Sequence, residues 1–91
     1  MFYFQIKCKP MPSNTYFGEI LGAYAATYID FKNLTGAYKL AEFFIQDSEW
    51  EIMDTIEYSA INYSDLTDLD EENMEAFNEH GVFIKYVMFD E

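Results

Sequence analysis

Carboxylates spaced like the ligands of a calcium-binding loop are the first chemical candidate in this chain. Such a loop needs oxygen ligands at its positions 1, 3, 5 and 12. The matching residues are Asp68, Asp70, Glu72 and Glu79. Position 6, where the loop turns sharply on glycine, is Asn73. A capped helix N-terminus explains the same residues, because the helix dipole favours carboxylates in the first turn. We therefore expect no metal site and no cofactor.

The only cysteine and the only histidine offer little to a catalytic mechanism. Cys8 is in alternating register with Phe4 and Ile6, which predicts a buried small hydrophobe, whereas a reactive thiol needs an exposed electropositive setting. His80 precedes Gly81 and is expected in the last turn of a short helix, where a cation complements the dipole. No pair among the seventeen carboxylates stands out as an acid and its base. The sequence predicts no catalytic residues and a protein that is not an enzyme.

Recognition of phosphate groups is unfavourable for this composition. The chain has no arginine, no GxGxxG and no GK[ST] pattern, so it lacks both a bidentate clamp and a glycine cradle for phosphate. Its sequence pI is about 4.1, and a chain of that charge is repelled by a polyanion. We expect no direct binding to nucleic acid.

The negative charge is concentrated in one half of the chain. Residues 46–91 contain fourteen of the seventeen Asp and Glu residues and one of the five Lys, and the net charge is -12. Like charges crowded on a small domain destabilise its compact state, so such a surface suggests attraction of a basic protein partner. Aromatic residues lie among these acids, and aromatic anchors surrounded by charge are typical of tight protein interfaces. The expected partner-binding residues are Asp65, Asp68, Asp70, Glu71, Glu72, Glu75, Glu79, Glu57, Tyr58 and Tyr63.

Alternating or continuous apolar residues predict four strands. Residues 2–9 alternate, which indicates a strand with one buried face. Residues 22–31 are predicted as a second strand, although a helical stripe that begins at Phe17 competes with it. Residues 50–63 are predicted as a strand because they are rich in β-branched and aromatic side chains, although a capping box permits a helix. Residues 82–89 are almost continuously apolar, which favours a central strand.

Two helices are predicted between these strands. Asn33 or Thr35 can cap the first, whose apolar residues recur at intervals of three and four. Asp68 or Asp70 can cap the second, which is short, acidic and stopped by Gly81. The resulting ββαβαβ order predicts an α+β fold, in which a four-stranded, mostly antiparallel sheet carries two helices on one face.

Length and composition predict one small domain over residues 1–91. The apolar fraction of 51% is too high for intrinsic disorder. A single cysteine excludes a disulfide within the chain and favours a reducing compartment, so we expect a cytoplasmic protein. We recognise no signal peptide and no transmembrane helix, and we expect no membrane partner.

Three functions remain open at the level of sequence. The first is a non-enzymatic acidic protein that docks its carboxylate-rich face on a basic protein, as an inhibitor, an immunity protein or antitoxin, or a nucleic-acid mimic. The second is a small metal-binding domain or carboxylate-dependent enzyme that uses the acidic cluster over residues 65–79. The third is a homo-oligomeric structural domain in which an aromatic face pairs with itself.

Overall fold

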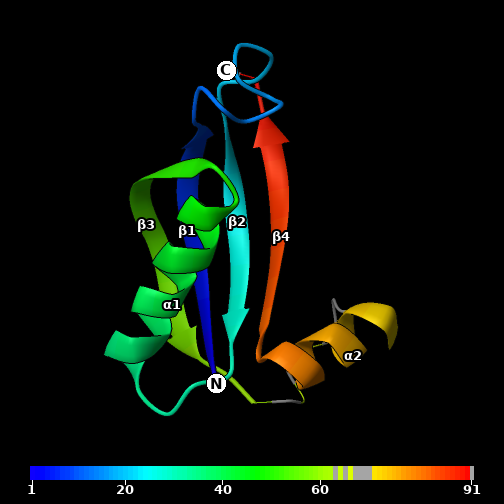
Figure 1. Cartoon of the computed structure of the whole chain (residues 1–91). Coiled ribbons are helices and arrows are strands. Elements are labelled where there is room, and N and C mark those ends of the chain that lie inside the picture. Colours follow the sequence, from blue (N-terminus) through cyan, green and yellow to red (C-terminus); the bar gives the residue numbers. More distant parts are fainter. Residues whose placement is uncertain (63, 65, 67–70, 91) are drawn as a thin grey trace.

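The computed structural model describes residues 1–62, 64, 66 and 71–90, with only the backbone of residues 71–73 and 76, and it has the predicted ββαβαβ order (Figure 1). The elements are β1 (Phe2–Pro10), β2 (Gly22–Ile29), α1 (Leu34–Asp47), β3 (Trp50–Ala60), α2 (Glu71–His80) and β4 (Val82–Phe89). The strand assignments preferred for residues 22–31 and 50–63 are therefore confirmed, with earlier ends. The predicted caps Asp68 and Asp70 lie outside the described residues. Neither helix is long and apolar enough to cross a membrane over the described part of the chain.

The four strands form one sheet in the order β3-β1-β2-β4, and every neighbouring pair is antiparallel. The predicted antiparallel sheet is confirmed, but the central position predicted for residues 82–89 is wrong, because β4 is an edge strand. Its apolar residues are explained by two separate clusters. Val82 and Ile84 pack on the main core, whereas Phe83 packs beside α2 on the opposite face. An edge strand that contacts apolar residues on both faces has the composition of a central strand.

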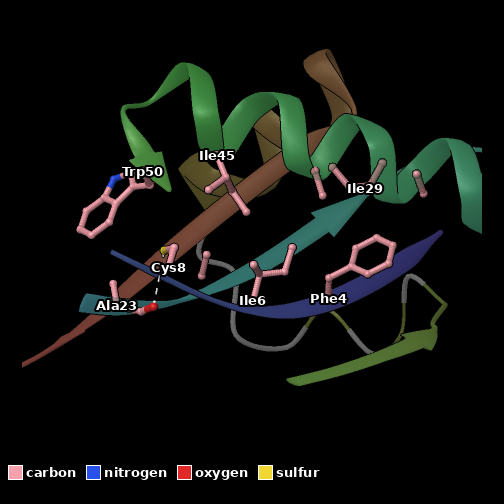
Figure 2. Close-up of a cluster of buried hydrophobic side chains, with 10 residues drawn as sticks. Phe4, Ile6, Cys8, Ala23, Ile29, Ile45 and Trp50 are labelled. Carbon is pink, nitrogen blue, oxygen red and sulfur yellow. Dashed lines mark hydrogen bonds between the residues drawn. The ribbon is translucent and has the colours of Figure 1, made fainter. Parts of the chain in front are cut away.

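Helix α1 covers one face of the sheet and lies across β1 and β3 (Figure 1). Asn33 caps it as predicted, with its Oδ1 accepting a hydrogen bond from the Gly36 N–H at 2.8 Å. Its buried residues are Ala37, Ala41 and Ile45. Two of these are small, and this lets the helix lie close to the strands. The core beneath it contains Phe4, Ile6, Cys8, Ala23, Ala25, Ile29 and Trp50 (Figure 2).

Helix α2 lies on the other face, so the predicted placement of both helices on one face is wrong. Phe77 of α2 is buried with Leu66, and both pack beside Tyr28 and Phe83. Tyr28 and Phe83 are cross-strand partners, and alternation puts them on the face opposite the core beneath α1. That face needs apolar cover where its aromatic residues gather, and α2 supplies it at the start of β4 (Figure 1).

Two bulges shape the edge strand β3. Its register with β1 shifts between Gln5 and Ile6 and again between Lys7 and Cys8, which leaves Ile56 and Met53 without a partner on β1. Each extra residue reverses the side to which the following side chains point. The two bulges also break the regular outer edge of β3, which discourages unspecific strand pairing.

Candidate functional site

The bulges place three carboxylates of β3 on the same face of the sheet. Glu51, Asp54 and Glu57 are three residues apart, and on a regular strand Asp54 would point to the opposite face. Their partners on β1 are Lys9, Lys7 and Gln5, respectively. The three partners are every second residue of β1, and their side chains lie on the face of the sheet that α1 leaves open. The carboxylates opposite them therefore follow one another at intervals of about 7 Å. We call Glu51, Asp54 and Glu57 the carboxylate row.

Only one member of the carboxylate row has an ion pair within the described part of the chain. The Lys9 Nζ lies 3.1 Å from a carboxylate oxygen of Glu51, and both side chains are about half exposed. An exposed pair of this kind contributes at most about 1 kcal/mol. Asp54 and Glu57 make no ion pair with a described residue, although Lys7 lies opposite Asp54. Two carboxylates of the row therefore remain available to a cationic partner.

Lys7 is held away from the row by an aromatic ring. Its Nζ lies 5.5 Å from the centroid of the Phe89 ring, a cation–π geometry. Phe89 can reach across β2 because Gly22 has no side chain. A Cβ at Gly22 would lie 2.7 Å from the Phe89 ring and 2.6 Å from the backbone oxygen of Cys8. The glycine thus leaves room for the ring that Lys7 contacts.

Exposed apolar side chains belong to the same strand as the carboxylate row. Met53 and Ile56, the two bulge residues, are 51% and 49% exposed, and Tyr58 is 62% exposed. All three belong to an edge strand whose outer side has no neighbour among the described strands. The β3 edge therefore combines apolar anchors with unpaired negative charge, which is the composition of a protein-binding surface. We call these six residues the β3 surface.

The structure separates the residues predicted to bind a partner into two groups. Glu57 and Tyr58 lie on β3 but point to opposite faces of the sheet. Glu75 and Glu79 are exposed on α2, which packs on β4 at the other edge. Two strands separate these edges, a distance of roughly 14 Å. The remaining predicted residues are Glu71 and Glu72, described by backbone only in the first turn of α2, and Tyr63, Asp65, Asp68 and Asp70, which lie outside the described residues.

Sequence reasoning missed Asp54, Met53 and Ile56 as parts of one surface, and it left Glu51 out of the expected partner-binding residues. The available signal was Asp54, which interrupts an otherwise apolar alternation from Trp50 to Tyr58. A polar residue at an expected core position of an edge strand is a sign of a bulge. The alternation alone could not say how many bulges there are or where they fall.

His80, which was considered for catalysis, lies on α2 at the other edge of the sheet. His80 ends α2 as predicted, with its Nε2 4.0 Å from a carboxylate oxygen of Glu79, and both side chains are exposed. Gly81 follows with a φ of 73°, and its N–H donates to the Phe77 carbonyl at 2.7 Å. Over the described residues, no three His, Cys, Asp or Glu side chains gather closely enough to hold a metal ion.

Cys8 is fully buried in the core, as predicted (Figure 2). Its Sγ lies 3.5 Å from the Ala23 carbonyl, to which the thiol donates. Burial raises the pKa of the Cys8 thiol from 9.0 to about 12. The thiolate, which is the reactive form, is therefore scarce at neutral pH.

We expect Cys8 of the native protein to react with an aromatic disulfide reagent at pH 8 at least about 100-fold more slowly than in urea. The raised native pKa also means that this thiol supports stability fully below pH 9 and that the support is lost as pH rises toward 12. The free energy of unfolding should therefore fall more steeply between pH 8 and pH 10 than it does in a Cys8→Ala variant. Rapid labelling of the native protein would contradict the burial.

A groove runs between α1 and β3 on the covered face of the sheet. It has a volume of about 440 Å³. Its lining consists of Phe4, Leu34, Thr35, Tyr38, Lys39, Glu42, Thr55 and Tyr58. We call it the α1–β3 groove. Tyr58 belongs both to this groove and to the β3 surface, so the two are continuous.

The outer edge of β4, which has no neighbour among the strands that the structure describes, differs from that of β3. No bulge interrupts its pairing with β2, and residues 80–89 contain no carboxylate. The Asp30 N–H donates to the Gly81 carbonyl at 2.8 Å, and alternate residues of an antiparallel strand bond to the same neighbour. The backbone groups of Ile84, Tyr86 and Met88 therefore point toward the free edge.

Together these features define a small α+β domain with a four-stranded antiparallel sheet, one edge of which exposes both carboxylates and apolar side chains. No family model, curated protein or solved structure matches the chain. Its function is therefore inferred from its own residues.

Proposed function

We propose that this protein is a non-enzymatic acidic binding protein that docks its β3 surface on a basic protein. The observation that carries the proposal is the carboxylate row on an edge strand that also exposes three apolar side chains, the bulge residues Met53 and Ile56 and, on the opposite face, Tyr58. Apolar anchors supply most of the affinity of protein interfaces, and charges around them supply orientation and speed of association. The net charge of -12 makes a basic partner the favourable one.

The spacing of the row supports a partner that normally binds a phosphate backbone. Carboxylates repeat along one face of β3 at intervals of about 7 Å, and two of the three, Asp54 and Glu57, make no ion pair with a described residue. A nucleic-acid strand presents its phosphates in the same way, one charge per nucleotide. An inhibitor, immunity protein or antitoxin of the nucleic-acid-mimic type would occupy the basic groove of such a partner and exclude its nucleic acid.

The carboxylates of α2 have a secondary role in this proposal. Glu75 and Glu79 lie at the opposite edge of the sheet, beyond the Debye length of about 8 Å at physiological salt. They add to the negative field that attracts a basic partner at low salt, without contacting it. The non-enzymatic part of the proposal is supported by the burial of Cys8 and by the surface position of His80.

The proposal is tested by capturing the partner from a lysate of the source cell at low and high salt, identifying it, and measuring its affinity for single variants. We expect Ile56→Ala and Tyr58→Ala each to weaken binding by about 30-fold, mainly through faster dissociation, because a truncated hot spot costs about 2 kcal/mol. Val87→Ala is the matched control, since Val87 is 55% exposed at the opposite edge. Equal losses for all three variants would place the interface elsewhere.

The bare edge of β4 favours a second candidate, a homo-oligomeric structural domain. An unpaired edge strand with no bulge and one charged residue is a template for pairing with another strand. If β4 pairs with β4 of a second copy, the protein should elute as a dimer in size-exclusion chromatography with light scattering. Met88→Pro should return it to a monomer, because it removes one outward N–H. A wild-type monomer at about 100 μM would exclude this candidate.

A further inference from the structure

The α1–β3 groove has fixed aromatic surfaces. Phe4 forms its base and is 1% exposed. Tyr38 meets the edge of the Phe4 ring at a centroid distance of 5.4 Å, and its hydroxyl is 2.5 Å from the Thr55 hydroxyl. Tyr58 lies directly opposite Phe4 in the strand register and leaves most of its ring exposed. Two rings are thus held in place, and a third is available at the mouth.

A carboxylate that makes no ion pair with a described residue lines the same groove. Glu42 is on α1, half-buried, and makes no ion pair with any residue that the structure describes. Lys39 precedes it by three residues and also lines the groove, yet the two side chains are not paired. A carboxylate that is partly removed from water beside aromatic rings is stabilised by a cation that reaches it. The groove is therefore lined mainly by aromatic and apolar side chains, with one carboxylate, Glu42, and one ammonium, Lys39, that are not paired with each other.

We propose that the α1–β3 groove receives an arginine side chain of the basic partner, with the guanidinium against Tyr58 and paired with Glu42. The net charge of -12 favours a cationic occupant, and Glu42 is the groove carboxylate that makes no ion pair with a described residue and can therefore pair with that cation. Arginine fits better than lysine, since a planar guanidinium stacks on aromatic rings, pairs bidentately with a carboxylate and is weakly hydrated. This inference rests on the proposed function and names the side chain that would anchor the partner.

The groove can be tested without the partner, using N-acetyl-arginine amide as the probe and two-dimensional NMR of the labelled protein. We expect shifts of Leu34, Tyr38, Thr55 and Tyr58 that saturate in the millimolar range. The amides of citrulline, norleucine and lysine should bind more weakly, the first two by about tenfold, which corresponds to about 1.4 kcal/mol. Citrulline keeps the shape without the charge, and norleucine keeps only the apolar stem.

Variants separate the groove from general attraction of cations. Glu42→Gln and Tyr58→Ala should each weaken binding of the arginine amide about tenfold. Glu57→Gln should leave that binding unchanged, because this variant removes a neighbouring charge that lies outside the groove. Equal binding of citrulline or norleucine, tighter binding of lysine, or loss on Glu57→Gln alone would overturn the proposal. The absence of chemical-shift changes at the groove residues at about 50 mM probe would also overturn it. If the probe fails but Ile56→Ala still weakens the captured partner, the arginine groove is wrong and the proposed function stands.

Discussion

Replacing Phe4 by alanine is expected to lower the free energy of unfolding by about 3–5 kcal/mol. Phe4 is 1% exposed, lies on the central strand β1 and packs under α1 in the main core. Its removal leaves a cavity that the rigid central strands cannot close, so both apolar transfer energy and packing are lost. The total free energy of unfolding of a domain of this size is about 5–15 kcal/mol, so the variant should be close to unfolding at 37 °C.

Phe43→Ala provides the matched control for this measurement. Phe43 is on α1 but 58% exposed, with its ring 5.4 Å from that of Phe44. An exposed truncation of the same chemistry usually changes stability by less than about 0.5 kcal/mol. Urea unfolding followed by far-UV circular dichroism measures both variants. Similar losses for Phe4 and Phe43 would mean that α1 does not cover the face of the sheet that carries Phe4.

Neutralising the two unpaired carboxylates of the row is expected to weaken binding of the identified basic partner by about 100-fold. The variant is Asp54→Asn with Glu57→Gln, and each lost charged contact costs about 1.5 kcal/mol. Neutral amides are preferable to lysine here, because a lysine at residue 54 would lie opposite Lys7 and destabilise the strand pair. Surface plasmon resonance at about 50 mM and 300 mM salt separates effects on association from effects on dissociation.

The carboxylates of α2 offer a control with the same change in net charge. Glu75→Gln with Glu79→Gln also removes two charges, but from an exposed helix at the other edge of the sheet. This variant should reduce only the association rate at low salt, by a few-fold. If the α2 pair costs as much affinity as the β3 pair at 300 mM salt, then the partner contacts α2 and the β3 surface is not the interface.

Much of the fold follows from local patterns that the sequence carries plainly. The alternation ending at Pro10 defines β1, and the three- and four-residue spacing after Asn33 defines α1, because each element buries one face whose period is set by its backbone geometry. Cys8 could be assigned to the core on the same basis. The stop of α2 at Gly81 was also readable, since few other residues adopt its positive φ.

The order of the strands in the sheet and the face on which each helix packs could not be predicted from such local patterns. The sequence of β4 is apolar on both faces, yet the strand lies at an edge, because the core under α1 covers one face and α2 covers part of the other. Periodicity reports how much of a residue is covered and says nothing about whether a strand or a helix covers it. The same limit explains why α2 was expected beside α1.

The class of the domain, the identity of its elements and the excess of negative charge in residues 46–91 follow from the amino-acid sequence alone. Which acids lie side by side depends on the tertiary fold. Glu51, Asp54 and Glu57 share a face because β3 is paired to β1 through two bulges, whereas Glu57 and Glu75 are kept apart by the order of strands in the sheet. Register and strand order arise from contacts between residues distant in the chain, and these contacts leave no periodic trace in the sequence around them.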